Sequence, residues 1–189
     1  MTPPDLVVVM RAADFAARRH IKQKRKGVAG EPYLNHLVEV ANLLAEALEG
    51  SDAPLIAAGL LHDTLEDTPT RYEELEAAFG SDIASLVAEV TDDKSLPRDE
   101  RKRRQVETTP SKSVRARLLK IADKTSNVRA IASSPPATWD VERCVQYVDW
   151  AELVVAGCRG LNASLDRGFD AAVIDAREAF SQETGRGTA

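Results

Sequence analysis

Apolar residues recur along nearly the whole chain at the three- and four-residue spacing of helices, and no stretch alternates long enough for a convincing strand. The helix predicted to begin at Pro32 shows the pattern clearly, because its apolar residues fall on one face. These residues are Leu37, Val40, Ala41 and Leu44. The chain is therefore predicted to be all-α, and we expect one domain, a single helical fold.

Local start and stop signals divide this pattern into successive helices. Asp5 is expected to cap a first helix that runs to about Gln23, and the glycines within residues 22–30 then interrupt the pattern. Capping-box spacing over Thr70–Glu73 predicts another helix, which should end at Phe79-Gly80. Further helices are expected at about 81–91, 114–132, 138–158 and 162–180, with a loop at 108–111. Residues 1–180 would then form the domain, and 181–189 a disordered tail.

The most charged segment is PRDERKRRQVE, residues 97–107. Its charges have both signs, and Pro97 stands at a favourable position for a helix start. The segment is predicted to be either an exposed helix or a partly mobile flap.

Composition narrows the possible function classes. The chain has 189 residues, 43% of them hydrophobic, and a net charge of −5, which argues against a general electrostatic grip on nucleic acid. No apolar run approaches the roughly 20 residues needed to cross a bilayer, and the start lacks the features of a signal peptide. Cys144 and Cys158 lack metal-site or redox spacing and suggest packing roles in a reducing compartment. We expect a cytoplasmic protein with a small-molecule partner and no membrane or nucleic-acid partner.

The stretch LLHDTLEDT, residues 60–68, places a histidine and three acids directly after the apolar run of residues 54–61. It lies at the end of a helix expected to start at Ser51 or Asp52. Ionisable groups at the end of a buried segment are costly unless they are paired or bind a metal. Either the helix simply reaches the surface here, or these residues belong to a metal site.

Other residues favour the metal site. His36 lies on a helix whose other face is apolar, and Asp123 follows a mostly apolar stretch. With His62 and Asp63 they would offer two imidazoles and two carboxylates, which suit Mn²⁺, Fe²⁺ or Zn²⁺ better than Mg²⁺.

Two more acids could take part in the chemistry. Glu66 and Asp67 each lie four residues after His62 and Asp63, so on a helix each stacks one turn beyond a proposed ligand. There they could orient an attacking water, take its proton, or protonate a leaving group. The alternative is that they are solvated carboxylates at a helix end.

These residues resemble the motifs of a known family. His36, His62-Asp63 and Asp123 are similar to the H…HD…D signature of HD-domain metal-dependent phosphohydrolases. A larger set of motifs resembles the hydrolase domain of the RelA/SpoT alarmone enzymes: Arg25-Lys26, GEPYLNH (30–36), LLHDTLEDT (60–68), Phe79-Gly80, TDDK (91–94), LKIADK (119–124) and NVR (127–129). Within that family, RKRRQVE (101–107) and the spacing of Trp139, Gln146, Tyr147, Trp150 and Ala151 are most similar to stand-alone small alarmone hydrolases of the metazoan SpoT-homologue type.

The resemblance implies a helical HD-domain fold, one Mn²⁺ ion, and removal of the 3′-pyrophosphate from ppGpp or pppGpp. It implies metal ligation by His36, His62, Asp63 and Asp123, and water positioning and proton transfer by Glu66 and Asp67. It places Arg25 at the guanine base, Lys26 at the phosphates, Asn127 at the nucleoside, and Arg143 and Tyr147 along the substrate groove. The basic residues just before His36 agree with this, although alone they would also suit a solvated loop.

Two alternatives remain open at this stage. The same site could remove the 2′-phosphate of NADPH or act on another nucleotide, or the fold could serve as a non-catalytic alarmone sensor. The chain also departs from the family at Thr125-Ser126, where many relatives have a bulky pair, and at Ala130, where some have a hydroxyl.

Overall fold

The computed structural model describes residues 2–186, which form helices joined by short connections, without strands beyond two isolated bridges. The prediction of an all-α fold is therefore confirmed. In chain order the helices are α1 (Pro3–Arg19), α2 (Tyr33–Ala47), α3 (Ala53–Leu61), α4 (Thr64–Asp67), α5 (Tyr72–Phe79), α6 (Ser81–Val90), α7 (Arg98–Thr108), the 3₁₀ turn η1 (Thr109–Ser111), α8 (Val114–Ser133), α9 (Val141–Ala156) and α10 (Ala163–Arg186).

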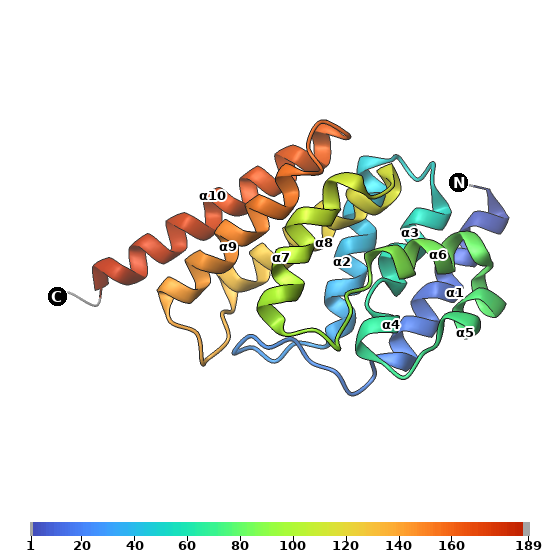
Figure 1. Cartoon of the computed structure of the whole chain (residues 1–189), viewed down its shortest axis with the longest axis horizontal. Helices are drawn as coiled ribbons and strands as arrows, with labels where there is room; N and C mark the ends of the chain where they lie inside the picture. Colours follow the sequence, from blue (N-terminus) through green and yellow to red (C-terminus); the bar gives the residue numbers. More distant parts are fainter. Residues whose placement is uncertain (1, 187–189) are drawn as a thin grey trace.

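Two helices, α3 and α8, form the interior of the molecule (Figure 1). Helix α3 packs against α1, α2 and α6, and nearly all of its residues are buried. Helix α8 packs against α2, α6, α9 and α10, so it joins the two sides of the molecule. Because α2, α3 and α8 also contact one another, polar residues on these three helices can meet in the interior.

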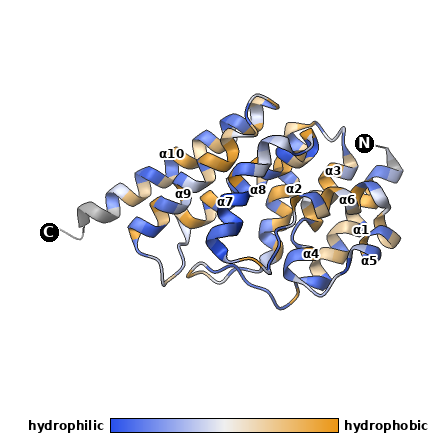
Figure 2. Cartoon of the chain, in the orientation of Figure 1, coloured by the Kyte–Doolittle hydropathy of each residue, from blue (hydrophilic) through white to orange (hydrophobic). Residues whose placement is uncertain are grey.

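The hydrophobic pattern predicted the buried faces well. The four apolar residues expected on one face of α2 are all buried in the common core. Helix α7 begins after Pro97 and contains no buried residue, and it is the most hydrophilic helix in Figure 2. Of the two interpretations of the charged segment, the exposed helix is thus confirmed.

Two predicted caps are wrong. Thr2, not Asp5, caps α1: its hydroxyl accepts from the Asp5 backbone N–H, while the Asp5 carboxylate accepts from the Thr2 N–H, which makes Asp5 the third residue of a capping box. The helix also ends earlier than expected, at Arg19. Helix α5 begins after Arg71, because the Thr70 hydroxyl pairs with that of Thr68 instead of capping it.

The C-terminal part differs in its boundaries. Asp140 caps α9 by accepting from the Arg143 N–H, and the predicted loop at 108–111 contains the turn η1. Helix α10 continues to Arg186, so residues 181–186 are helical, and the rest of the predicted tail lies outside the described residues. No helix among the described residues has the length and apolar character needed to cross a membrane.

Candidate metal centre and active site

The sequence suggested that the stretch LLHDTLEDT lies on one continuous helix, but the structure shows that it does not. Helix α3 ends at Leu61, His62 and Asp63 form the turn that follows, and Glu66 and Asp67 belong to the short helix α4. The Asp67 N–H still donates to the Asp63 carbonyl at 2.8 Å, so the one-turn spacing of these two acids survives the break.

Four side chains converge where this turn meets α2 and α8. The Nε2 atom of His36, on α2, lies 3.5 Å from both Asp63 Oδ2 and Asp123 Oδ1. The Nε2 atom of His62 lies 3.1 Å from Asp63 Oδ2 and 3.8 Å from Asp123 Oδ1. Both histidines and Asp123 are buried, while Asp63 is half-buried. The structure therefore brings together the four residues that the sequence nominated as ligands.

The hydrogen bonds of His62 leave one ring nitrogen available for a ligand. Its Nδ1 lies 2.8 Å from the Gly59 carbonyl oxygen, which can only accept, so Nδ1 carries the proton. Its Nε2 is buried and has no hydrogen-bond partner among the described residues. An imidazole nitrogen without a hydrogen-bond partner that faces two carboxylates is suited to binding a divalent cation.

The charges of the cluster also favour a bound cation. Burial opposes a charged imidazole, yet Asp63 and Asp123 outweigh it and raise the pKa of His62 to about 10. Although burial opposes ionisation of Asp63 as well, the two histidines hold the pKa of this carboxyl well below its usual range. The two carboxylates thus draw a positive charge into the site. A divalent cation would provide that charge, and ligand atoms of His36, His62 and Asp123 lie within 4.8 Å of one another, so the residues present fit a metal ion.

Neighbouring side chains hold the carboxylates in place. The Tyr33 hydroxyl donates to Asp63 Oδ2 at 2.6 Å. Lys124 Nζ lies 2.9 Å from Asp123 Oδ2, and the Asn127 amide donates to Asp123 Oδ1 at 2.6 Å. Sequence reasoning missed Tyr33 and Lys124 in this role, because their partners depend on tertiary packing. The only available signal was their position beside residues already nominated.

Glu66 and Asp67 lie at the edge of this cluster, each beside a cation. Glu66 is half-buried, and burial together with the charges of Asp92 and Asp63 raises the pKa of its carboxyl. Arg101 approaches it at 3.5 Å, and the Asp92 N–H donates to it at 3.2 Å. Asp67 pairs with Lys94 and accepts from Gln23 at 3.0 Å. Burial and the neighbouring carboxylates thus favour the protonated form of Glu66 more than in a free glutamate.

A pocket of about 360 Å³ opens beside the cluster. Its walls include Arg25, Lys26, Tyr33, Asp67, Asn127 and Tyr147. Arg25 donates to the Asn127 side-chain oxygen at 3.1 Å, and Asn127 in turn donates to Asp123. The basic segment before His36 is therefore a wall of the pocket and is joined to the cluster through one amide.

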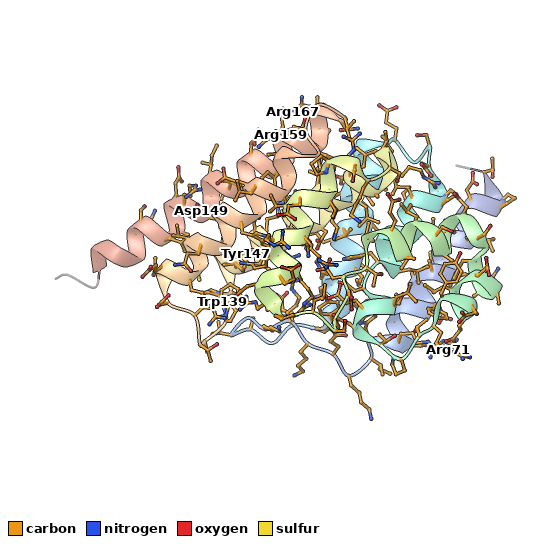
Figure 3. All side chains as sticks on the ribbon, viewed as in Figure 1. Arg71, Trp139, Tyr147, Asp149, Arg159 and Arg167 are labelled. Atoms are coloured by element: carbon orange, nitrogen blue, oxygen red, sulfur yellow. The ribbon has the colours of Figure 1, made fainter. Side chains whose placement is uncertain are left out.

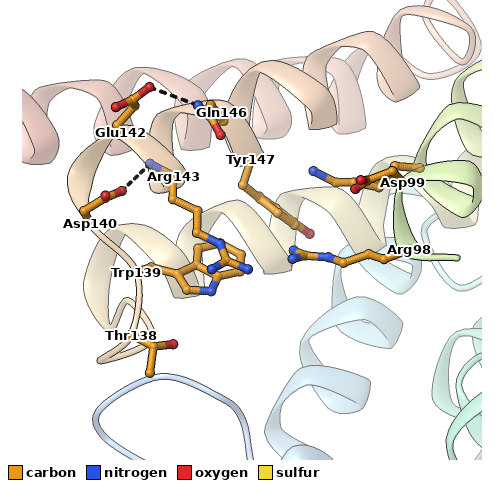
Figure 4. Close-up of a pocket in the computed structure, with 10 residues that line it drawn as sticks. Arg98, Asp99, Thr138, Trp139, Asp140, Glu142, Arg143, Gln146 and Tyr147 are labelled. Carbon is orange, nitrogen blue, oxygen red and sulfur yellow. Dashed lines mark hydrogen bonds between the residues drawn. The ribbon is translucent and has the colours of Figure 1, made fainter.

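A second hollow of about 440 Å³ shares Tyr147, Trp139 and Arg98 with this pocket. Trp139 and Tyr147 lie near each other in Figure 3, and the centroids of their rings are 5.8 Å apart. Figure 4 shows Arg143 over the Trp139 ring, 4.8 Å from its centroid, with Arg98 extending toward the same ring. Lys102 also lines the hollow, so three cations and two aromatic rings face it, together with the acids Asp99, Asp140 and Glu142.

Comparison with known proteins identifies the family. The family model for the HD domain matches residues 12–160 of this chain. The chain belongs to the HD domain family. Among curated proteins it is 46% identical over 159 residues to the guanosine-3′,5′-bis(diphosphate) 3′-pyrophosphohydrolase MESH1 of Danio rerio, covering 84% of this chain and 88% of the relative. It is also 46% identical to MESH1 of Homo sapiens, over 84% of this chain and 88% of that protein.

Solved structures agree with the assignment to the HD domain family. The structure described as a metazoan ortholog of SpoT that hydrolyzes ppGpp superposes with a TM-score of 0.83 at 41% identity. The match covers 93% of this chain and 95% of that one. A Listeria monocytogenes protein shares 29% identity with a TM-score of 0.65, over 80% of this chain and 99% of its own.

The HD domain contains one further polar residue near the site that the sequence analysis left aside. His20 is buried, and its ring stacks on Tyr33 with centroids 5.2 Å apart. Its Nδ1 lies 2.6 Å from the Gln23 side-chain oxygen, and the Gln23 amide donates to Asp67. His20 therefore supports Tyr33 and Gln23, which hold Asp63 and Asp67. Its position at the end of α1 gave no sign of this.

Proposed function

We propose that this HD domain is a metal-dependent hydrolase that removes the 3′-pyrophosphate from ppGpp or pppGpp, giving GDP or GTP and pyrophosphate. The observation that carries the proposal is the cluster of two imidazoles and two carboxylates beside a pocket with cationic walls. The MESH1 relatives, which bear the name of this activity, support the choice of substrate.

We further propose that the ion is Mn²⁺, held by His36, His62, Asp63 and Asp123. Mixed imidazole and carboxylate ligands suit Mn²⁺ better than Mg²⁺, which prefers oxygen ligands and water. When bound, such an ion supplies positive charge that polarises a phosphoryl oxygen and makes a neighbouring water more acidic.

Two acidic side chains of the protein would transfer the protons that the reaction requires. Water attacks the phosphorus attached to O3′, the P–O3′ bond breaks, and O3′ leaves as the hydroxyl of the nucleotide product. One proton must leave the water and one must reach O3′. Glu66, whose pKa is raised by burial and by neighbouring carboxylates, and Asp67, which Gln23 and Lys94 orient, are the candidates for taking and returning it.

The walls of the pocket suit the rest of the nucleotide. The Arg25 guanidinium can stack on a planar base, Lys26 can neutralise phosphate charge, and Asn127 can contact the nucleoside. The second hollow, with Arg143 and Tyr147, would receive the substrate's remaining anionic groups along the groove. The cations that line the first pocket, Lys24, Arg25, Lys26 and Arg98, would offer a polyanion a local positive surface although the net charge of the chain is −5.

Nucleotide analysis tests the function directly. Purified protein is incubated with ppGpp, pppGpp or NADPH, each with Mn²⁺ and with a chelator, and the products are separated by chromatography. We expect GDP or GTP and pyrophosphate to appear only in the samples that contain Mn²⁺, and not in those that contain the chelator. Turnover of NADPH but not of ppGpp would favour the 2′-phosphatase alternative, and binding of ppGpp without turnover would favour a sensor.

Substitutions in the basic wall of the pocket test its role in substrate binding. Arg25→Ala or Lys26→Ala is expected to raise KM with a smaller effect on kcat, because both would contact groups whose charge does not change in the reaction. Lys22→Ala is the matched control, since Lys22 is an exposed cation of the same loop that does not line the pocket. If Arg25→Ala instead lowered metal content and left KM unchanged, the assignment of this wall to substrate binding would be wrong.

A further inference from the structure

Behind His36, on the side away from the carboxylates, three polar side chains lead from the ring to the surface. His36 Nδ1 lies 2.8 Å from the Ser126 hydroxyl oxygen, and that hydroxyl donates to Glu39 Oε2 at 2.6 Å. The other oxygen of Glu39 accepts from Arg129 at 3.1 Å. His36 and Ser126 are buried, Glu39 is half-buried, and Arg129 is exposed.

The direction of these hydrogen bonds follows from the number of protons available. A serine hydroxyl has one hydrogen, and an ionised carboxylate can only accept. Because Ser126 gives its hydrogen to Glu39, its oxygen must accept from His36, so Nδ1 of His36 carries the ring proton. His36 Nε2 is then left with a lone pair, directed at Asp63 and Asp123.

We propose that Ser126 and Glu39 are positioning residues that hold His36 in the tautomer able to bind the metal. Neither residue touches the ion or the substrate. Glu39 fixes the direction of the Ser126 hydroxyl, Ser126 fixes the proton of His36, and the anionic end of the series makes the imidazole a stronger donor. The inference rests on the proposed metal binding, and it assigns the departure at Thr125-Ser126 a specific role.

The role of the Ser126 hydroxyl can be tested separately from that of its neighbour Thr125. A pocket of about 200 Å³ lies on this side of His36, and Glu39, Ser126, Arg129 and Ala130 line it. A threonine at 126 keeps the hydroxyl that lies between His36 and Glu39. Thr125, the preceding residue of α8, donates its hydroxyl hydrogen to the Ile121 carbonyl and takes no part in the series.

The test measures metal affinity, which does not depend on turnover. Metal-free protein is titrated with Mn²⁺, and the free ion is followed by electron paramagnetic resonance. Ser126→Ala is expected to raise the dissociation constant at least about 10-fold, the range found when partners of metal-bound histidines are removed. Ser126→Thr should stay within about 2-fold of wild type, and so should Thr125→Val, which removes a buried hydroxyl elsewhere on the same turn.

Glu39→Ala provides a second route that does not depend on the stability of Ser126→Ala, because Glu39 is only half-buried. Without the carboxylate the Ser126 hydroxyl can donate to His36 instead, which favours a proton on Nε2. Long-range ¹H–¹⁵N spectra of the metal-free protein should show His36 protonated at Nδ1 in wild type and a mixture of tautomers in Glu39→Ala, with weaker Mn²⁺ binding.

The outcomes separate the inference from the function on which it rests. If wild type bound no divalent ion, the proposed metal dependence would fail. If wild type bound Mn²⁺ and both Ser126→Ala and Glu39→Ala bound it equally well, or if Thr125→Val weakened it as much as Ser126→Ala, the positioning role alone would be overturned.

Discussion

Replacing His62 or Asp63 with alanine is expected to remove both the bound divalent ion and the hydrolytic activity. His62 offers a buried ring nitrogen that forms no hydrogen bond with residues 2–186, and Asp63 lies between the two imidazoles. Loss of either leaves too few ligands for a tight site. Since a metal ion contributes several kcal/mol of transition-state stabilisation, kcat/KM should fall by at least about 10³-fold.

The measurement combines elemental analysis of the purified variants with the hydrolysis assay. Asp14→Ala is a suitable control, because Asp14 is an exposed carboxylate paired with Arg18 on α1. Circular dichroism checks that each variant is folded. A folded His62→Ala protein with full metal content, or full activity of wild type after complete removal of metal, would contradict the proposed centre.

Glu66→Gln and Asp67→Asn are expected to separate chemistry from metal binding. Each substitution keeps the size of the side chain and removes its ability to take up a proton. The metal should remain, because neither side chain is among the four that converge on the proposed ion position. The expected loss in kcat is about 10²- to 10⁴-fold, the usual contribution of a general acid–base group, with a smaller change in substrate affinity.

Single-turnover hydrolysis and Mn²⁺ content should be measured on the same preparations. Glu73→Gln serves as the control, because Glu73 is an exposed acid in the first turn of α5. The pH profile adds a further check: the raised pKa of Glu66 should appear as a limb of the wild-type profile and be absent from Glu66→Gln. Near wild-type kcat with bound Mn²⁺ in both variants would identify these acids as ordinary helix-end carboxylates.

Much of the fold could be predicted because its signals are local. The apolar face of α2, the end of α5 at Phe79 and the start of α7 after Pro97 each follow from spacing or from a proline or glycine. The errors arose where several residues compete for the same backbone groups. Thr2 and Asp5 both suit a cap, and only the reciprocal bonds show which of them is outside the helix.

The sequence nominated the four residues that the structure brings together, but it did not indicate the residues that support them. His36, His62, Asp63 and Asp123 stand out because charged and imidazole groups interrupt apolar runs. The break of the helix after Leu61 could not be foreseen, since neither glycine nor proline occurs at residues 62–64. Partners such as Tyr33 and Ser126 depend on which helices pack together, which local sequence does not contain.

The central place of α8 also governs when the site can come into existence as the protein is made. His36, His62 and Asp63 are synthesised first, but Asp123, Ser126 and Asn127 all lie on α8. At about 5–20 residues per second, roughly 3–12 s separate translation of His62 from that of Asp123. Helix α10, which packs along α8, follows later still. A nascent chain that lacks α8 holds only three of the four residues proposed to bind the metal, so we expect the complete site to form only after α8 has been synthesised.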